Sequence, residues 1–178
     1  MGKGEIFVPR NAKMFLMPQY PYVPLGDLRR VVTYPLASSQ VDDGKLRELM
    51  NLVGLDHLVD RLDEQAPWEY ALSGGERQRV AFVRLLLHEP DFVVMDEATS
   101  ALDPSSQEHL LTTVTERLSR AAIISIAHRP ELQAFHQRML VFEHRPGGSR
   151  LISDGHIVAP PIGLLPQIMN WLHALGTA

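Results

Sequence analysis

The sequence contains no cysteine, which excludes a disulfide framework and any metal site built on thiolates. No apolar run reaches about 18 residues, the length that a membrane-spanning helix needs. The first ten residues, MGKGEIFVPR, lack the apolar core of a signal peptide. The net charge of −4 argues against a general nucleic-acid binder, which usually presents a basic face. These absences predict a soluble globular chain with no nucleic acid among its partners.

Lysine is also scarce, because the chain has only Lys3, Lys13 and Lys45. A phosphate-binding P-loop needs the pattern G-x-x-x-x-G-K-S/T, since its backbone amides and its lysine hold the phosphates. None of the three lysines precedes serine or threonine, and none follows glycine at the required spacing. The 178 residues therefore contain no P-loop.

What the chain does contain is an alternating pattern of strands and helices. With 178 residues, 45% of them hydrophobic and 21% charged, it suits one domain that buries roughly 70% of its unfolded surface. Short apolar runs typical of buried strands occur at 14–17, 92–95 and 122–126, and a fourth strand is expected at 138–142. Helical patterns separate these runs, which predicts a wound α/β fold with a mainly parallel sheet.

The helices between the first two strands have two interpretations. A short helix is expected over 27–34, and two amphipathic helices over 43–61, with a break at Gly54. They fit a small helical subdomain of about residues 27–90 inserted into an α/β core. They also fit ordinary helices of that core.

Two helix starts carry clear capping signals. Ser73 and Glu76 form a capping box, which predicts a helix that begins at Gly74–Gly75 and ends at Glu89-Pro90. Its expected buried face is Val80, Val83, Leu86 and Leu87. Asp103 and Pro104 then provide the cap and first residue of another helix.

The C-terminal part has weaker signals. Residues 150–158 are expected to pair as an antiparallel edge hairpin, which ends a domain of residues 1–158. Residues 159–178 then form a linker and an amphipathic helix. That helix docks either on the domain's own core or on a partner or membrane.

Four apolar residues at 92–95 lead directly into Asp96 and Glu97. At the end of a buried strand, Asp96 is placed to hold a magnesium ion that neutralises nucleotide phosphates. Glu97 points in a different direction and can polarise a water molecule against the terminal phosphate. An acid pair after an apolar strand also occurs as a plain helix cap, so the neighbouring motifs decide between the two interpretations.

The segment LSGGE, residues 72–76, places two glycines at a predicted helix start. Gly74 and Gly75 leave backbone amides accessible, and the positive end of the helix dipole points at whatever binds there. Ser73 adds a hydroxyl donor. The combination is an anion site suited to a terminal phosphate, although S-G-G-E taken alone is also an ordinary capped helix.

The whole stretch from Leu72 to Asp103, LSGGERQRVAFVRLLLHEPDFVVMDEATSALD, resembles the second half of an ATP-binding cassette ATPase. This is the nucleotide-hydrolysing domain of ABC transporters. The resemblance implies a P-loop NTPase core with an inserted helical subdomain, and ATP and Mg²⁺ as cofactors. It assigns the signature motif of the family to Ser73, Gly74, Gly75 and Glu76. In the family, this motif acts on the nucleotide that the other subunit holds.

Three further residues match motifs of the same family. Gln19, which follows the first strand, resembles the Q-loop glutamine that reaches magnesium and water and contacts the transport domain. His128 in SIAHRPEL resembles the switch histidine that senses the terminal phosphate. Asp103 resembles the D-loop acid that works across the dimer interface, and it can also cap its own helix.

The stretches MFLMPQYPYVPLGDLRRVVTYP and ISIAHRPELQAFHQRMLVFE resemble subfamily D of these transporters and its bacterial relatives. Members carry fatty acyl derivatives, vitamins or peptides. The resemblance covers roughly residues 4–143. It implies a head-to-tail dimer with a second nucleotide-binding domain, and a transmembrane domain as partner. It also implies a cytoplasmic position at the inner face of the membrane, through a transmembrane domain that is not in this chain.

The missing P-loop separates this chain from the family. Only 18 residues precede Gln19, whereas a strand, phosphate loop and helix need roughly 30. We therefore expect the chain alone to bind ATP poorly and to be inactive. One alternative function is a non-catalytic module that donates its signature motif and D-loop to a partner's nucleotide site.

The first strand of the family's sheet is missing as well. In the family it lies between the strands that correspond here to 123–126 and 138–142. We expect a gap between these strands, or a rearranged pairing with exposed apolar surface.

Overall fold

The computed structural model describes residues 5, 7–146 and 148–157. The chain divides into two compact units. One runs from Asn11 to Ile126, and the other combines Met1–Arg10 with Ala127–Ala178. The candidate site residues lie in the first unit, except His128, which belongs to the second.

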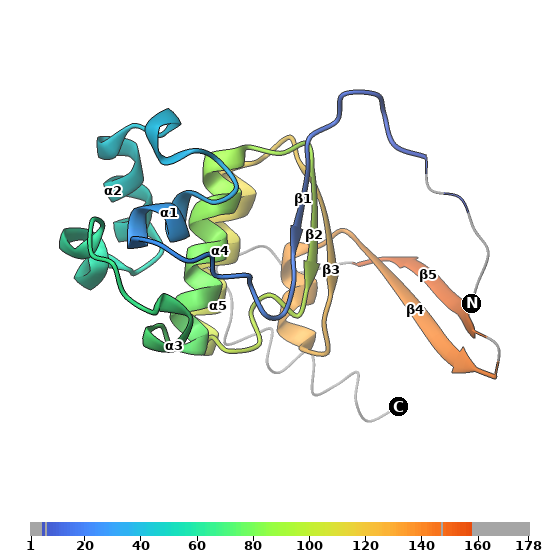
Figure 1. The fold of residues 1–178 in the computed structure, drawn as a ribbon. Helices are drawn as coiled ribbons and strands as arrows, with labels where there is room; N and C mark the ends of the chain where they lie inside the picture. The colour runs from blue at the N-terminus through green and yellow to red at the C-terminus, as the bar shows by residue number, and fades with distance from the viewer. Residues whose placement is uncertain (1–4, 6, 147, 158–178) are drawn as a thin grey trace. The chain divides into compact units, whose positions relative to one another are not determined.

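A parallel three-stranded sheet organises the first unit (Figure 1). Its strands are β1 (Met14–Met17), β2 (Phe92–Asp96) and β3 (Ala122–Ile126), in the order β1-β2-β3. All three match apolar runs identified in the sequence, so the wound α/β class and its parallel sheet are confirmed. The carboxyl ends of the strands meet at one edge, where open α/β sheets place functional groups.

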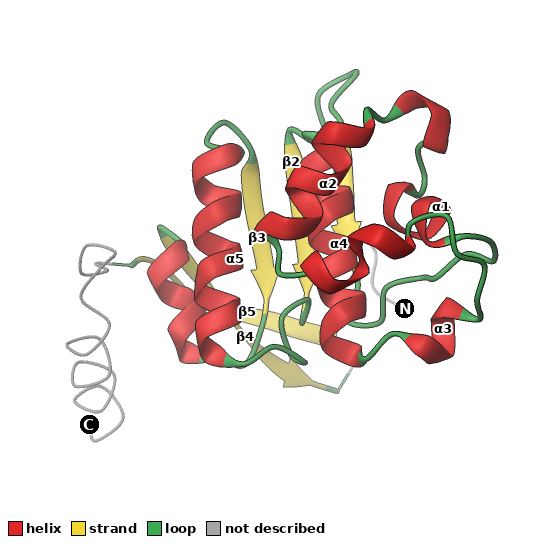
Figure 2. Cartoon of the chain, turned by 90° about the vertical axis from the view of Figure 1, so that its left-hand side faces the viewer, coloured by secondary structure: helices red, strands yellow, loops and turns green. Residues whose placement is uncertain are grey.

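The helices of this unit lie on one side of the sheet (Figures 1 and 2). The long helices α4 (Gly74–His88) and α5 (Pro104–Arg117) pack directly behind the strands. A group of shorter helices packs beyond α4. These are α1 (Leu28–Thr33), η1 (Ser38–Gln40), α2 (Asp43–Leu52), η2 (Asp56–Arg61) and α3 (Trp68–Ala71), of which η1 and η2 are 3₁₀ helices.

The capping signals operate as predicted. The side chain of Ser73 accepts a hydrogen bond from the Glu76 amide, and Glu76 bonds back to the Ser73 amide, which completes the capping box of α4. Asp103 caps α5 by accepting from the Ser106 amide, and Pro104 is its first residue. Asp42 caps α2 by accepting from the Lys45 amide. Each bond satisfies an amide that has no partner within its helix.

The buried face predicted for α4 is confirmed for Val80, Val83 and Leu86 but is incomplete. Ala81, Phe82 and Leu85 are buried together with Val80, Val83 and Leu86, whereas Leu87 is only half-buried. The reason is that α4 lies between the sheet and the shorter helices, so apolar neighbours surround most of its circumference. Periodicity indicates one buried face only when a helix has one packed side.

The second unit contains an antiparallel hairpin, formed by β4 (Arg138–Arg145) and β5 (Gly148–His156). The hairpin expected near 150–158 is therefore present. However, β4 pairs with β5 in a sheet of its own and is not a fourth strand of the parallel sheet. Before the hairpin, Pro130–Phe135 forms the 3₁₀ helix η3.

Within residues 5, 7–146 and 148–157, none of the helices has both the length and the apolar character needed to cross a bilayer. The predicted linker and amphipathic helix at 159–178 lie outside the described residues.

Candidate functional site

The ends of β1 and β2 bring together residues that are far apart in the sequence. Gln19 follows β1 by two residues, and its Nε2 donates a hydrogen bond of 2.7 Å to a carboxylate oxygen of Glu97, directly after β2. Asp96 is the last residue of β2 and is exposed. The structure thus places Gln19, Asp96 and Glu97 at one end of the sheet, as the sequence predicts.

The backbone of Glu97 turns sharply after the strand. Its φ of 46° lies in the left-handed region, which costs a non-glycine residue about 1–3 kcal/mol. The Glu97 amide nevertheless donates to the Ile126 carbonyl at 2.9 Å, which ties the turn to the end of β3. Because of this turn, Asp96 and Glu97 do not continue the alternation of a strand, and the two carboxylates have different surroundings.

The signature segment forms a compact network at the start of α4. One carboxylate oxygen of Glu76 accepts from the Ser73 amide at 2.8 Å and from the Ser73 hydroxyl at 2.6 Å. The other oxygen lies 2.7 Å from Nε2 of His57, at the beginning of η2. Partial burial opposes ionisation of Glu76, but the bonds from Ser73 and His57 outweigh it and lower the pKa of the carboxyl.

The signature glycines pack closely against the loop that follows the acid pair. A Cβ atom on Gly75 would lie 3.3 Å from the carbonyl oxygen of Ala101, which is tighter than an ordinary contact. Gly74 and Gly75 therefore let the start of α4 approach the loop that follows the acid pair. This packing places the candidate anion site beside residues 98–103.

Gln78 connects the signature segment at the start of α4 with the residues at the ends of β1 and β2. Its side chain is 2% exposed, and its Oε1 accepts from the Ala101 amide at 2.9 Å. Its Nε2 donates to the Ser100 hydroxyl at 3.1 Å and to the Gln19 carbonyl at 3.5 Å. One buried amide thus joins α4, the loop after the acids and the loop after β1.

Asp103 caps α5 as described, and its hydrogen bonds with Ser106 lower the pKa of its carboxyl. Nη2 of Arg79, on α4, lies 4.0 Å from Oδ2 of Asp103 and donates to the Ser106 hydroxyl at 2.6 Å. Nη1 of Arg79 donates to the Val53 carbonyl at 2.7 Å. As the cap of α5, Asp103 can still take the role in a dimer interface that the family resemblance implies.

His128 lies two residues after the end of β3, in a bend at the start of the second unit. The sequence does not single out Gln78 or His57, although both contact the candidate site residues. Gln78 sits inside the L-S-G-G-E-R-Q-R string, but a polar residue on a helix has no sequence feature that reveals its burial. His57 stands 19 residues from its partner Glu76, and no periodic pattern links the two.

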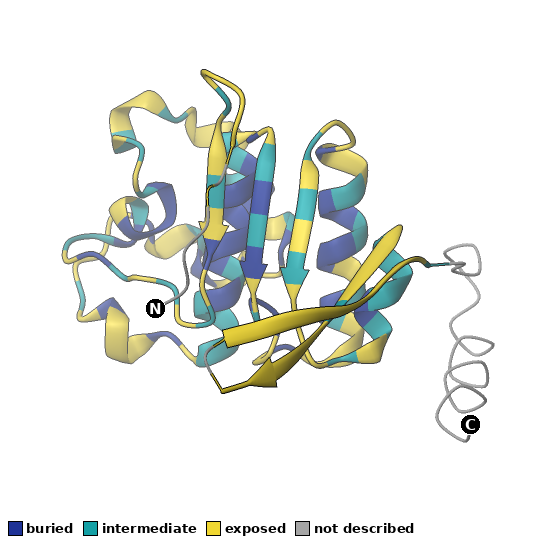
Figure 3. Cartoon of the chain, turned by 90° about the vertical axis from the view of Figure 1, so that its right-hand side faces the viewer, coloured by how far each residue is buried: buried dark blue, intermediate teal, exposed yellow. Residues whose placement is uncertain are grey.

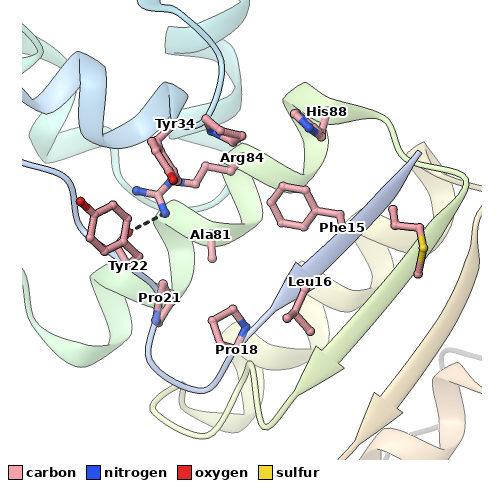
Figure 4. A pocket seen from close by; sticks show the side chains of 11 residues that line it. Phe15, Leu16, Pro18, Pro21, Tyr22, Tyr34, Ala81, Arg84 and His88 are labelled. Carbon is pink, nitrogen blue, oxygen red and sulfur yellow. Dashed lines mark hydrogen bonds between the residues drawn. The ribbon is translucent and has the colours of Figure 1, made fainter. Parts of the chain in front are cut away.

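A pocket of about 350 Å³ lies beside the Gln19 loop (Figure 4). Aromatic and proline side chains supply most of its wall, including Phe15, Pro21, Tyr22 and Tyr34. Figure 4 shows the Arg84 side chain of α4 between the two tyrosines, with its hydrogen bond of 2.8 Å to the Tyr22 carbonyl.

Arg84 is largely buried. Its Nε and Nη2 atoms both donate to the Val31 carbonyl, and its guanidinium lies 5.5 Å from the ring centre of Tyr34. Burial lowers the pKa of Arg84 to about 10, so the group is still charged at neutral pH. The pocket therefore combines an apolar wall with a buried positive charge.

Comparisons with known proteins identify the family of the chain. The family model described as ABC transporter matches residues 10–100, which is about half of the chain. The chain therefore belongs to the ABC transporter ATP-binding family.

An uncharacterized ABC transporter ATP-binding protein of Haemophilus influenzae is 36% identical over 143 residues, which are 80% of this chain and 24% of that protein. The ABC transporter D family member 3 of Dictyostelium discoideum is 36% identical over 153 residues, 79% of this chain and 20% of that protein. The chain thus spans about a quarter or less of the relatives' length. The resemblance to subfamily D and its bacterial relatives is confirmed.

Among solved structures, a bacterial Atm1-family ABC exporter with ATP bound matches with a TM-score of 0.69 and 25% identity. The match covers 93% of this chain and 28% of that one. The fold is therefore that of an ABC exporter's nucleotide-binding domain, reduced by the strand and P-loop that this sequence does not contain.

The donor atoms at the sheet end suit magnesium. The ion prefers oxygen ligands, and it is usually held by one or two carboxylates together with substrate phosphates. Asp96 offers an exposed carboxylate, and the amide of Gln19 that donates to Glu97 also carries an oxygen. In the part of the chain that the structure describes, no group of three or more histidine, aspartate or glutamate side chains forms a metal cage.

Proposed function

We propose that this chain is the ATP-hydrolysing domain of an ABC transporter, without its P-loop, and that hydrolysis is coupled to transport across a membrane. The observation that carries the proposal is the hydrogen bond between Gln19 and Glu97 beside the exposed Asp96. Three groups at the carboxyl end of a parallel sheet have the chemistry that phosphoryl transfer to water requires. Membership of the ABC transporter family supports ATP as the nucleotide.

Each residue has a proposed task. Asp96 and Gln19 hold Mg²⁺, which would neutralise charge on the phosphates. Glu97 orients and polarises the attacking water, and its bond from Gln19 keeps the carboxylate in place. His128 senses the terminal phosphate from the chain after β3.

The signature motif serves a second nucleotide site. Ser73, Gly74 and Gly75 present donors at the start of α4, where the helix dipole favours an anion. Glu76 stabilises this turn through the capping box, and Asp103 contributes at the dimer interface. The partner is a second nucleotide-binding domain in a head-to-tail dimer, since the motif acts on phosphates that another subunit holds.

Without a P-loop, these residues have nothing in the chain to hold the phosphates against them. We expect the isolated chain to be inactive, because phosphoryl transfer depends on positioning and charge neutralisation. The second candidate function is a non-catalytic module that donates Ser73–Glu76 and Asp103 to a partner's site. The capping box, which holds Ser73 and Glu76 in place at the start of α4, is compatible with this function.

The pocket beside Gln19 is the proposed contact with a transmembrane domain. Tyr22 is 61% exposed at its wall, and exposed aromatic residues beside a pocket are typical of protein interfaces. The Gln19 loop continues directly from this wall to the hydrogen bond with Glu97. Binding at the pocket is thereby linked to the catalytic acid. With this contact, we propose a position of the domain in the cytoplasm, against the inner face of the membrane.

The test is to fuse a strand–P-loop–helix segment of about 30 residues before Lys13 and to measure ATP turnover. We expect Mg²⁺-dependent turnover that Glu97→Gln abolishes. The exposed Glu69→Gln is the matched control and should leave turnover unchanged. The unfused chain should show none. Turnover by the unfused chain would contradict the expected inactivity, and equal rates for Glu97→Gln and Glu69→Gln would refute the role of Glu97.

A further inference from the structure

The candidate anion site at the start of α4 contains an acid, which works against the binding of an anion. Glu76 follows Ser73, Gly74 and Gly75, and its Oε2 lies 2.6 Å from the Ser73 hydroxyl. Although partial burial opposes ionisation, hydrogen bonds lower the pKa of this carboxyl, so Glu76 is negatively charged at neutral pH. A phosphate bound by Ser73 would therefore face a second negative charge one hydrogen bond away, and like charges at that distance repel.

The Ser73 hydroxyl has one hydrogen, and in the structure Glu76 receives it. The hydroxyl donates to Oε2 of Glu76 and accepts from the Glu76 amide at 3.2 Å. A phosphate that takes this hydrogen deprives Oε2 of one donor and leaves it with the Ser73 amide at 2.8 Å. The carboxylate thus loses a donor when a second anion approaches, and its remaining hydrogen bonds must stabilise more of its charge.

His57 supplies a donor to the other carboxylate oxygen. Its Nε2 lies 2.7 Å from Oε1 of Glu76. An ionised carboxylate only accepts hydrogen bonds, so Nε2 carries the hydrogen in this contact whether the ring is neutral or charged. Because this bond does not involve Ser73, it is retained when the hydroxyl turns to a phosphate.

The fold holds His57 in this place. Its neighbours Leu55 and Leu58 are 0% and 3% exposed, which anchors the backbone on both sides of it. Just before them, the Val53 carbonyl accepts from Arg79 of α4 at 2.7 Å. That bond ties the segment that carries the imidazole to the helix that carries the acid. A donor on such an anchored backbone is already in position and loses little freedom when it bonds.

Arg61 is a second cation whose charge reaches Glu76, but its side chain is bound elsewhere. Its Nε and Nη2 donate to the two carboxylate oxygens of Glu64 at 2.7 and 2.8 Å. The guanidinium also lies 4.9 Å from the ring centre of Trp68. Of these two side chains, both in the described part of the chain, His57 is the one that contacts the Glu76 carboxylate.

We infer that His57 is a positioning residue of the signature segment: it holds the Glu76 carboxylate and offsets its charge, so that the Ser73 hydroxyl can turn to a phosphate. Its contribution is larger with phosphate bound, because only then does Glu76 give up the hydroxyl and face a second anion. An interaction that is stronger in the bound state raises affinity, whereas one of equal strength in both states does not. The phosphate part of this inference rests on the proposed function, and the bond between His57 and Glu76 does not.

The test compares His57→Leu with His57→Gln in the full 178-residue chain. Leucine has no donor, whereas glutamine keeps a neutral N–H donor on a side chain of similar reach. The probe is inorganic phosphate at constant ionic strength and neutral pH, and NMR follows the amide signals of Gly74 and Gly75. We expect His57→Leu to weaken binding about threefold to tenfold, the effect of one hydrogen bond, and His57→Gln to restore most of the affinity. The control His144→Leu, at an exposed histidine of β4, should leave binding unchanged.

A double substitution shows whether His57 acts through Glu76. The side chain in Glu76→Gln has no charge to offset, so adding His57→Leu should change phosphate binding much less than it does in the unmodified chain. An equal loss in both backgrounds would mean that His57 does not act through Glu76, and the inference would be wrong. Failure of His57→Gln to restore binding would refute it as well. The dispersion of the amide signals shows whether each variant is folded.

The pKa of the Glu76 carboxyl separates the inference from the proposed function, because it is measured without phosphate. Loss of the His57 bond should raise it in His57→Leu and not in His144→Leu, as NMR titration of the carboxyl carbon would show. If the pKa rises but phosphate shifts neither glycine amide in any variant, the bond stands and the proposed phosphate site fails. If phosphate binds His57→Leu as tightly as the unmodified chain, the proposed site stands and the inference fails.

Discussion

Replacing Gln78 by methionine tests whether the two halves of the candidate site are held together by one buried amide. Methionine keeps the length and approximate volume of the side chain, so the cavity contribution is small. The substitution removes the hydrogen bonds to the Ala101 amide at 2.9 Å and the Ser100 hydroxyl at 3.1 Å. At roughly 0.5–1.5 kcal/mol for each bond, we expect a loss of about 2 kcal/mol in the free energy of unfolding.

The assay is urea denaturation followed by far-UV circular dichroism, with thermal melts as a second measurement. For a chain of this size, about 2 kcal/mol corresponds to a decrease of about 4–8 °C in Tm. Gln65→Met is the matched control, because Gln65 is exposed, and it should change stability by less than about 0.5 kcal/mol. If Gln78→Met is as stable as Gln65→Met, the amide does not hold the loops together and our reasoning is wrong.

Three further predictions concern the helix starts and the turn at Gly54. Ser73→Ala removes the cap of α4 and should lower the free energy of unfolding, measured by urea denaturation, by about 1 kcal/mol. The control Ser39→Ala, at an exposed serine, should leave it almost unchanged. Equal effects of the two substitutions would argue against the cap. Hydrogen bonds lower the pKa of the Glu76 carboxyl in the folded protein. The contribution of Glu76 to stability is therefore present above the ordinary glutamate pKa of about 4.3 and is lost as the pH falls through the lower, folded pKa. Glu76→Gln should reduce the loss of unfolding free energy at acidic pH, and an unchanged loss would contradict this. Gly54 has a φ of 78°, and an added Cβ would lie 2.6 Å from Nη1 of Arg79. Gly54→Ala should therefore lower the free energy of unfolding by about 1–3 kcal/mol. The control Gly155→Ala, with open space around the added Cβ, should leave the free energy of unfolding nearly unchanged.

Local signals in the sequence were sufficient for the three strands of the parallel sheet, for the two long helices and for the family. The apolar runs became β1, β2 and β3, which pair through their backbone groups, but the expectation that these strands are buried is wrong for much of β1 and β3 (Figure 3). The caps at Ser73 and Asp103 are short-range hydrogen bonds, so residues three positions apart reveal them. The missing P-loop is likewise a property of the sequence alone.

Tertiary structure decided which side chains meet. The bond between Gln19 and Glu97 joins positions 78 residues apart, and Gln78, His57 and Arg84 acquire their roles only from packing. No local pattern encodes such contacts, because they depend on how strands align and how α4 is enclosed. The same reason explains the error on α4, whose periodicity could not show that it is covered on two sides.

The exposed side of the parallel sheet shows both contributions together (Figure 3). From the sequence, the missing strand predicts a gap between the strands at 123–126 and 138–142, or a rearranged pairing with exposed apolar surface. Only the register of three parallel strands puts Leu16, Val94 and Ile124 in one row and Ile126 beside Asp96. Side-chain direction in a sheet is set by pairing between strands, and pairing is a property of the folded chain.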